Sequence, residues 1–413
     1  MAARRATYPR QVDRCPLLPL PVPAGAGALQ VRDALERALS GAGPAVAPHP
    51  ADSAPADLPE LRAGDLPDGL ALVVGTSGST GTPKRALLTA SALRASARAT
   101  HDRVGGPGQW LLAMPAHHIA GLQVLLRSVV AGTEPRAVDT RAGFTVDAFA
   151  SATASLDAAV PRHYTALVPT QLVRLLQDSR GRAALQRYDA VLLGGSAAPS
   201  ALLAAAESAA VRVLTTYGMS ETAGGCVYDG EPLACSHVRI EADGRILLGG
   251  DTLAAGYLGR ADLTDAVFSR DADGRRWFRT DDQGSMSADG RLVVTGRVDD
   301  VINTGGVKVA PRQVEEALLS HVPGVSEVVV LGTPDPEWGE AVGAVVVLAD
   351  GREDLAVGDV RAALRGVLPG PALPRRVVAV TSIPVRGPGK PDRKEIGRIL
   401  AEGATYDRRT PRD

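Results

Sequence analysis

The chain has 413 residues, of which 45% are hydrophobic and 22% are charged. This length exceeds what a single hydrophobic core organises, and the ordinary composition excludes wholesale disorder, so we expect two or three folded units. The 45 Lys and Arg side chains balance 46 Asp and Glu, which argues against nucleic acid or a membrane surface as a partner and favours small molecules.

The expected compartment is the cytoplasm. No apolar run has the length of a transmembrane helix, and polar residues interrupt the N-terminus before the apolar core of a signal peptide could form. Cys15, Cys226 and Cys235 have neither the pattern of a disulfide framework nor the spacing of zinc ligands. We therefore expect a reducing environment and no membrane insertion.

The first half of the chain predicts a sheet covered by helices. Apolar residues recur at helical spacing over residues 30–40, whereas the Pro-rich segment 44–59 predicts a loop. After Gly69, a short apolar run of strand character ends directly in a glycine-rich loop. Further strands are predicted at residues 110–114, 166–169, 190–193 and 211–215, with a helix at 196–210. Strands that alternate with helices indicate an α/β fold.

The second half predicts a small β subdomain followed by a compact α+β unit. Asp-Gly pairs at 243–244, 273–274 and 289–290 separate short β-branched runs, as hairpins require. Beyond them, the pattern predicts helices at 313–320 and 357–368 and strands at 325–331, 342–348 and 376–381. The change of texture at 296–300 divides the chain into a large domain, residues 1–298, and a small C-terminal domain, residues 299–413.

Lysine is scarce in this chain. Only four of the 45 basic residues are lysine, and these are Lys84, Lys308, Lys390 and Lys394. Arginine can replace lysine wherever the side chain is solvated, but not where a compact ammonium must reach one oxygen. The four lysines are therefore candidates for function, with a solvated surface position as the alternative for each.

The glycine-rich loop at 76–84 has the composition of a phosphate-binding loop. Its glycines let backbone N–H groups approach phosphate oxygens, its hydroxyls add donors, and Lys84 supplies a positive charge. Pro83 stands before the lysine and the GxxxxGK[ST] spacing is absent, which excludes a Walker loop. A flexible Ser/Gly linker is the alternative, but linkers seldom follow a buried strand.

Four segments together resemble the acyl-adenylate-forming superfamily of acyl-CoA synthetases, adenylation domains and luciferases. They are the loop at 76–84, Thr-Tyr-Gly-Met-Ser-Glu-Thr at 216–222, Arg-Thr-Asp-Asp at 279–282 with Gly-Arg-Val-Asp-Asp at 296–300, and Gly-Pro-Gly-Lys-Pro-Asp-Arg at 387–393. The resemblance implies a large N-terminal domain of α/β sheet subdomains with a small β subdomain, followed by a small mobile α+β lid.

The resemblance also implies an ATP site. Tyr217 and Gly218 would lie beside the adenine, Lys84 would contact pyrophosphate oxygens, and Asp282 would accept the ribose hydroxyls. Asp281 occupies a position that is more often glycine, so either aspartate could bind the ribose. The residues implied around ATP or AMP are Thr76, Ser77, Gly78, Ser79, Thr80, Gly81, Lys84, Gly194, Gly195, Ser196, Thr216, Tyr217, Gly218, Met219, Ser220, Asp282 and Arg297.

Two residues of these segments have expected roles in catalysis, and a third is the expected hinge. Glu221 is the candidate ligand of a magnesium ion shared with ATP, because magnesium is usually held by one or two carboxylates plus phosphates. Lys390 would offset the charge that develops as pyrophosphate leaves. Asp299 resembles the family's hinge, about which the small domain rotates after adenylation.

Two segments are candidates for the acid site. His-His-Ile-Ala-Gly at 117–121 resembles the family's stretch beside the acyl group, so we expect substrate or packing roles for His117 and His118 rather than metal binding, with His118 also a catalytic candidate. Arg127 lies in an otherwise apolar, helix-like run, 122–130, where a lone arginine is costly unless it reaches solvent or an anion.

These residues, with Val-Pro-Thr-Gln-Leu at 168–172 and Leu-Leu-Gly-Gly-Ser-Ala at 192–197, resemble the o-succinylbenzoate-CoA ligases of menaquinone biosynthesis, especially the short actinobacterial kind. That acid has two carboxylates, so one would be adenylated while Arg127 anchors the aromatic one directly or through water. The substrate-binding residues so implied are His117, His118, Arg127, Thr170 and Gly194.

The expected reaction has two halves: carboxylate and Mg-ATP give an acyl-adenylate and pyrophosphate, and coenzyme A then gives the thioester and AMP. The expected cofactors and partners are thus ATP, Mg²⁺, coenzyme A and a small carboxylic acid. Three alternatives remain, namely another aromatic or aliphatic acyl-CoA ligase, a stand-alone adenylation domain that loads a carrier protein, and a non-catalytic nucleotide-binding protein. The oligomeric state, including a homodimer, stays open.

Overall fold

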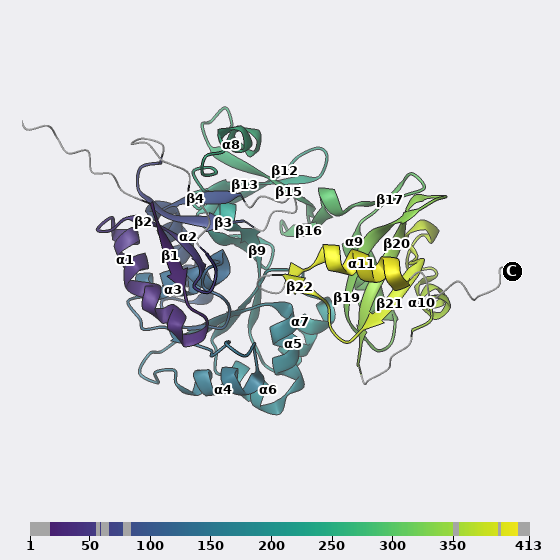
Figure 1. The fold of residues 1–413 in the computed structure, drawn as a ribbon, viewed down its shortest axis with the longest axis horizontal. Coiled ribbons are helices and arrows are strands. Elements are labelled where there is room, and N and C mark those ends of the chain that lie inside the picture. The colour runs from purple at the N-terminus through teal and green to yellow at the C-terminus, as the bar shows by residue number, and fades with distance from the viewer. Residues whose placement is uncertain are drawn as a thin grey trace, which may run out of the picture.

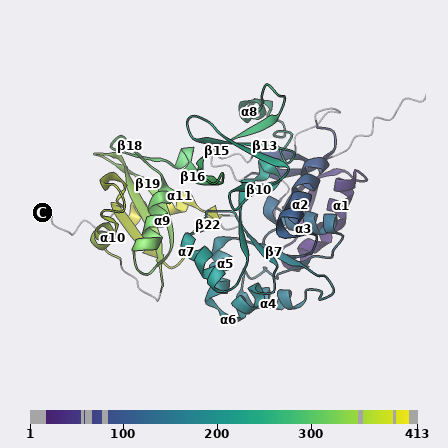
Figure 2. The same ribbon diagram turned by 180° about the vertical axis from the view of Figure 1, so that it is seen from behind.

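The computed structural model describes residues 17–54, 58, 66–76, 84–349, 355–386 and 390–403. The strands and helices up to Arg297 form a larger part, and those that follow form a smaller part beside it (Figure 1). The same two parts are seen from behind in Figure 2. The predicted α/β class, with a large N-terminal part, a small β subdomain and a small α+β C-terminal part, is confirmed.

A seven-stranded sheet is the centre of the larger part, with strand order β11-β10-β9-β8-β7-β5-β6. The strands from β5 to β9 run parallel, and β10 and β11 are antiparallel additions. Their bounds are β5 Gln109–Leu112, β6 Arg136–Ala137, β7 His163–Leu167, β8 Ala190–Leu193, β9 Val213–Met219, β10 Gly224–Tyr228 and β11 Glu231–Pro232.

Helices bury both faces of this sheet. All four residues of β8 are buried, and they alternate between two apolar clusters: Ala190 and Leu192 belong to one, Val191 and Leu193 to the other. Such unbroken apolar strands are typical of parallel sheets with two covered faces. The first cluster contains side chains of α1 Arg32–Ser40, α2 Ala90–Val104 and α3 Ile119–Ala131, and the second contains those of α4 Val146–Ala154, α5 Pro169–Gln177, α6 Ser179–Leu185 and α7 Ser200–Ser208.

A four-stranded sheet at the start of the chain corrects one prediction. The segment 44–59, expected to be a loop, contains a strand that pairs in parallel with an earlier strand along its whole length. Neither strand was predicted, because both contain prolines, and a residue without an N–H is disfavoured in sheets away from edges and bulges. The strands are β1 Leu17–Val22, β2 Ala45–Pro50, β3 Leu70–Gly75 and β4 Arg85–Thr89.

Two predicted helices begin later than the pattern indicates. The helix expected at 30–40 is α1, preceded by a 3-10 helix, η1 Gly25–Val31. The helix expected at 196–210 is α7, whose first residue follows Pro199. Proline fits the start of a helix because its missing N–H would have no partner there.

The small β subdomain forms as predicted. The strand order is β12-β13-β15-β14, with β16 paired to β15. Gly244, Gly274 and Gly290 each adopt positive φ at the hairpin turns, which explains the three Asp-Gly pairs. The elements are β12 Ser236–Ile240, β13 Arg245–Gly250, α8 Ala261–Val267, β14 Phe268–Arg270, β15 Arg276–Met286 and β16 Leu292–Arg297.

The C-terminal part is a second α+β unit with its own apolar cores. A short 3-10 helix, η3 Val298–Asp300, connects it to β16, and this is where we predict the domain boundary. Its sheet has the order β18-β17-β20-β19, with β21 paired to β20. The elements are β17 Ile302–Thr304, β18 Val307–Val309, α9 Pro311–His321, β19 Val325–Asp335, β20 Gly339–Leu348, α10 Val357–Leu364, η5 Gly370–Ala372, β21 Arg376–Val380, β22 Val385–Arg386, β23 Lys390–Pro391 and α11 Arg393–Gly403.

Gly121, in the first turn of α3, permits a close approach between the helix and the preceding turn. A Cβ at this position would lie 2.3 Å from the carbonyl oxygen of Pro115. We expect Gly121→Ala to lower the free energy of unfolding by about 1–3 kcal/mol, because the backbone must move to relieve the overlap. Urea unfolding followed by circular dichroism measures the change.

Gly358 in α10 is the matched control, because it is an exposed helical glycine with open space where a Cβ would be. Gly358→Ala should leave stability unchanged or raise it by up to about 1 kcal/mol. Equal unfolding midpoints for Gly121→Ala and the parent chain would refute the packing argument.

Candidate active site

The carboxyl ends of β8 and β9 form the centre of the site. Gly194, Gly195 and Ser196 follow β8, and the residues from Thr216 to Met219 end β9. In open α/β sheets, ligands bind outside the carboxyl ends of the strands. The sequence predicts a strand at residues 211–215, but β9 continues to Met219, where β10 pairs antiparallel with it.

Two glycines keep this region free of side-chain atoms. A Cβ at Gly194 would lie 2.5 Å from the hydroxyl oxygen of Thr216, on the neighbouring strand. A Cβ at Gly218 would lie 2.2 Å from the carbonyl oxygen of Gly224. Both glycines therefore have a packing reason, which is the close approach of a neighbouring strand.

Asp282, on β15, is a buried carboxylate with two donors. Its Oδ2 accepts a hydrogen bond of 2.8 Å from the Tyr217 hydroxyl, and its Oδ1 lies 3.4 Å from Nη1 of Arg297. Burial, and next the Asp282 charge, raise the pKa of Tyr217 well above its usual value, so the phenol keeps its proton and donates. Asp281 differs, because its side chain is 47% exposed and lies in ion pairs with Arg245 and Arg297.

The ends of the glycine-rich loop are held together. The backbone N–H of Thr76 donates to the carbonyl oxygen of Lys84 over 2.7 Å, which extends the β3–β4 pairing by one pair. The Ser220 hydroxyl lies 3.5 Å from the carbonyl oxygen of Gly75, so the loop and the segment after β9 are neighbours. The predicted phosphate-binding residues outside the described part of the chain are Ser77, Gly78, Ser79, Thr80 and Gly81.

Glu221 lies in a short 3-10 helix, η2 Ser220–Thr222, directly after β9. Its side chain is buried, and its Oε1 accepts a hydrogen bond of 2.8 Å from the hydroxyl of Tyr257. Burial, followed by the charge of Glu221, raises the pKa of Tyr257, so this phenol also keeps its proton. The sequence analysis did not identify Tyr257. The one feature that could have drawn attention to it is the scarcity of tyrosine, with seven in the chain.

Four of the candidate acid-binding residues lie in or directly before two helices, α3 after β5 and α5 after β7. His118 precedes the first residue of α3, and its ring centroid is 4.2 Å from that of His117. Burial lowers the pKa of His117, which favours a neutral imidazole. Thr170 is the second residue of α5.

Arg127 lies in α3 and is buried, with 3% of its surface exposed. One guanidinium nitrogen donates to the Tyr228 hydroxyl over 3.2 Å, and the guanidinium carbon is 5.0 Å from the ring centroid of Trp110. Nε has no partner, and no carboxylate among the described residues pairs with Arg127. Burial lowers the pKa of Arg127. The alternative that this side chain reaches solvent is therefore wrong, and Arg127 is a core cation without a counter-anion in the described part of the chain.

Gln123 lies one helical turn before Arg127 and contacts the segment that follows Glu221. Its Nε2 donates to the carbonyl oxygen of Ala223 over 2.6 Å, and Ser96 donates to the same oxygen over 3.1 Å. Ala223 has a φ of 52° and separates Glu221 from β10. The sequence reasoning missed this bond, because a glutamine in an apolar helix carries no motif.

The predicted hinge lies beside the predicted ribose site. Asp299 Oδ2 is 3.7 Å from Arg297, which also pairs with Asp282. The next residue, Asp300, forms a 2.6 Å ion pair with Arg393 at the start of α11. Lys390 begins β23, and its side chain lies outside the described part of the chain.

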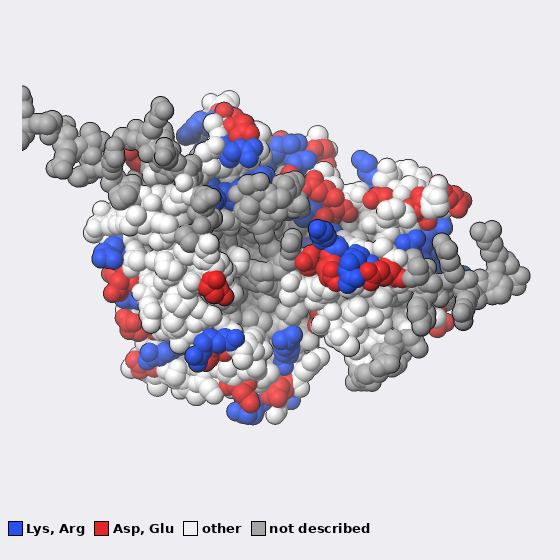
Figure 3. All heavy atoms as spheres, in the orientation of Figure 1, with Lys and Arg blue, Asp and Glu red and all other residues white. Residues whose placement is uncertain are grey.

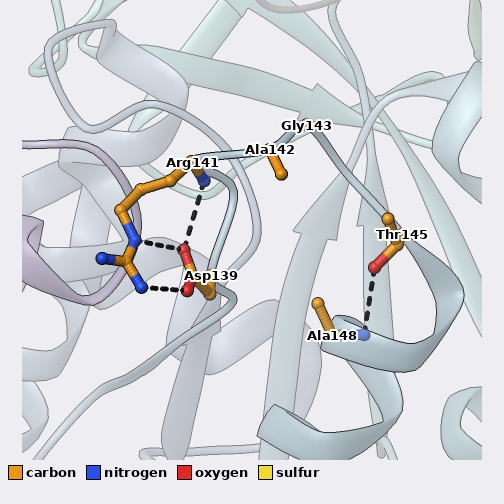
Figure 4. A pocket seen from close by; sticks show the side chains of 6 residues that line it. All are labelled: Asp139, Arg141, Ala142, Gly143, Thr145 and Ala148. Carbon is orange, nitrogen blue, oxygen red and sulfur yellow. Dashed lines mark hydrogen bonds and ion pairs between the residues drawn. The ribbon is translucent and has the colours of Figure 1, made fainter.

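A surface depression away from these residues is a weaker candidate for a binding site. A depression of about 500 Å³ lies between β6 and α4, at the opposite edge of the seven-stranded sheet from β10 (Figure 4). Within it Arg141 donates to both oxygens of Asp139, over 2.9 and 2.6 Å, so these charges satisfy each other.

Basic and acidic side chains are also interspersed on the face shown in Figure 3, as the balanced composition predicts. Among the described residues, no helix is long and apolar enough to cross a bilayer.

Sequence relatives cover nearly the whole chain. A probable 2-succinylbenzoate–CoA ligase of Mycobacterium tuberculosis is 46% identical over 385 residues, which are 92% of this chain and 98% of the relative. The 2-succinylbenzoate–CoA ligase of Listeria monocytogenes serotype 4b is 31% identical, over 79% of this chain and 69% of the relative.

Solved structures share the fold. The o-succinylbenzoate CoA synthetase of Bacillus subtilis, in complex with its acyl-adenylate intermediate, superposes with a TM-score of 0.69 at 23% identity, over 92% of this chain and 87% of that one. The amide bond synthetase McbA of Marinactinospora thermotolerans superposes with a TM-score of 0.72 at 26% identity, over 92% and 89%.

Family models agree with these relatives. The AMP-binding enzyme model matches residues 28–258, and the model of the AMP-binding enzyme C-terminal domain matches residues 313–390. The first match covers more than half of the chain and contains the glycine-rich loop, Arg127 and Glu221. The chain therefore belongs to the family of AMP-binding enzymes.

Proposed function

We propose that this chain is an ATP-dependent acid–thiol ligase that converts o-succinylbenzoate, ATP and coenzyme A into o-succinylbenzoyl-CoA, AMP and pyrophosphate. The relative from Mycobacterium tuberculosis, matched over nearly its whole length, supports this reaction. That match carries the choice of acid, and Arg127, a buried cation for which the described residues supply no carboxylate, is the proposed partner of the acid's second carboxylate. A buried charge is costly unless it is paired, and a second substrate carboxylate would pair with it.

In the first half-reaction, a carboxylate oxygen of the acid attacks the α-phosphorus of ATP. The bond between that phosphorus and the bridging oxygen breaks, and pyrophosphate leaves with the electron pair. Lys84 would bind the leaving phosphates, and Lys390 would offset the charge on the reacting phosphoryl group. Asp282 would hold the ribose. Its burial and its contacts with Tyr217 and Arg297 favour it for this role over the half-exposed Asp281.

Glu221 fits the role of a magnesium ligand. It is a buried carboxylate whose contact with Tyr257 is a neutral donor, so this contact leaves the negative charge of Glu221 uncancelled. Magnesium is usually bound through one or two carboxylates together with substrate phosphates. When bound, it would neutralise charge on the phosphate oxygens of ATP.

In the second half-reaction, the thiol of coenzyme A releases its proton to solvent and attacks the acyl carbon of the adenylate. The bond from that carbon to the phosphate oxygen breaks, and AMP leaves. We propose that rotation of the small domain about Asp299 removes Lys390 and admits the thiol. His117, His118, Thr170 and Gly194 would line the acyl group in both halves.

A panel of carboxylic acids, assayed by pyrophosphate release with the purified chain, tests this proposal. Succinylbenzoate is expected to give a higher kcat/KM than benzoate, fatty acids or malonate, with free coenzyme A converted to a thioester in step with AMP. ATP–pyrophosphate exchange without thioester formation would favour an adenylation domain that loads a carrier protein. No exchange with any acid, despite ATP binding, would refute the catalytic assignment.

A further inference from the structure

Tyr257 contacts both ends of the proposed triphosphate site. Its hydroxyl donates to Oε1 of Glu221 over 2.8 Å, and the ammonium nitrogen of Lys84 lies 5.5 Å from the centroid of its ring. The residue is 4% exposed, and its ring packs edge-on against Phe268 at 5.9 Å. One fixed side chain thus touches the candidate metal ligand and the lysine that ends the glycine-rich loop.

The backbone around Tyr257 makes the same connection. The segment 254–258 joins β4 through hydrogen bonds of 2.9 Å from Leu87 N to Gly256 O and 2.8 Å from Leu258 N to Arg85 O. At its other end, the N–H of Ala254 donates to the carbonyl oxygen of Glu221 over 2.8 Å. The segment therefore holds the strand that follows the loop and the turn that bears Glu221 in one fixed relation.

The chemistry of the two contacts suits a site for a metal and phosphates. A phenol that donates to one oxygen of Glu221 restricts the orientation of the carboxylate. A neutral donor achieves this without cancelling the negative charge, which an arginine or lysine would do. On the ring face, the attraction between a cation and an aromatic ring positions Lys84 without a carboxylate competing for it.

We propose that Tyr257 is a positioning residue for Mg-ATP, which orients Glu221 through its hydroxyl and Lys84 through its ring. This inference rests on the proposed function only in assigning Mg-ATP to the site, and it does not depend on which acid is activated. Tyr257 touches no reacting atom, so its effect is on how tightly Mg-ATP binds and on how the first half-reaction depends on magnesium.

Tyr257→Phe removes the hydroxyl and keeps the ring with its Phe268 and Lys84 contacts. Calorimetry is expected to show up to a roughly tenfold weaker affinity for ATP in the presence of Mg²⁺, because a carboxylate that is no longer anchored must lose side-chain freedom when it binds the cation. In EDTA, where Glu221 has no cation to bind, the affinity for ATP should be unchanged. The Mg²⁺ concentration that gives half-maximal ATP–pyrophosphate exchange should rise, and thioester formation from supplied acyl-adenylate should not change.

Tyr188→Phe is the matched control. Tyr188 is 5% exposed, and its hydroxyl makes a 2.7 Å hydrogen bond with Thr153 in the core between α4 and the sheet. This variant loses the same atom from an equally buried ring, so it should lower thermal stability, as a lost buried hydrogen bond does, and show the parent's ATP affinity with and without Mg²⁺.

Combining Tyr257→Phe with Glu221→Gln completes the test. If the hydroxyl acts through Glu221, adding Tyr257→Phe to Glu221→Gln should weaken Mg-ATP binding no further. Equal losses of ATP affinity in Mg²⁺ and in EDTA, or equal effects of Tyr257→Phe and Tyr188→Phe, would overturn the proposal. A parent chain that binds Mg-ATP but adenylates no acid would overturn the proposed function and leave the role of Tyr257 standing.

Discussion

Lys390→Ala is expected to lower the rate of adenylate formation by roughly 10²- to 10³-fold, the usual effect of removing one group that stabilises developing charge. The hairpin of β22 and β23 carries Lys390, and the N–H of Asp392 closes its base by donating to Pro384 O over 2.8 Å. The ion pair between Arg393 and Asp300 then ties this base to the residue after the proposed hinge. The lysine would thus move with the hinge as one unit.

The same variant should form thioester normally when it is given the acyl-adenylate, because no phosphoryl charge develops in that step. Rapid-quench measurement of each half-reaction separates the two. Lys394→Ala is the control, because Lys394 is exposed on α11 only four residues further on, and both half-reactions should keep the parent's rates. If Lys390→Ala slowed both halves equally, the assignment of Lys390 to the first half alone would be wrong.

Arg127→Met should reduce kcat/KM for succinylbenzoate by roughly 30-fold or more, since loss of one partner of a buried charge pair costs at least about 2 kcal/mol. Methionine fills much of the same space beside Trp110 and carries no charge. The KM for ATP should stay the same. Steady-state pyrophosphate release gives both constants.

The decisive comparison uses 4-oxo-4-phenylbutanoate, which is succinylbenzoate without the aromatic carboxylate. The parent enzyme should prefer succinylbenzoate strongly, and Arg127→Met should reduce or remove that preference, because the analogue has no second anion to lose. Tyr228→Phe removes the hydrogen-bond acceptor of Arg127 but keeps the cation, so most of the preference should remain. A uniform loss of activity toward both acids would indicate that Arg127 serves packing alone.

The sequence predicts the fold best where local pattern and tertiary environment agree. The Asp-Gly hairpins and the buried strand β8 were predictable because turn chemistry and unbroken apolar runs each have one structural meaning. The paired strands β1 and β2 were not, because Pro19, Pro21 and Pro48 suppress the local strand signal and only the parallel pairing compensates. The extension of β9 was likewise missed, since it depends on a partner strand later in the chain.

In the candidate site, too, some residues were predictable from local sequence and others were not. Residues with a motif, such as Glu221 and Asp282, could be named in advance, and the structure adds their burial and their partners. Gln123 and Tyr257 could not be named, because their importance comes from contacts with residues that are 100 and 36 positions away. Spacing along one chain carries no information about such pairs.

Arg297 has a consequence for how freely the two parts of the chain can turn. Its side chain is 45% exposed, and its contact with Asp299, which is 53% exposed, spans 3.7 Å. Exposed ion pairs of this kind contribute about 0–1 kcal/mol and are screened by salt. This contact alone would therefore oppose the proposed rotation about Asp299 with little more than thermal energy. Through this contact, the ionic strength of the buffer should accordingly have little influence on the proposed rotation of the small domain.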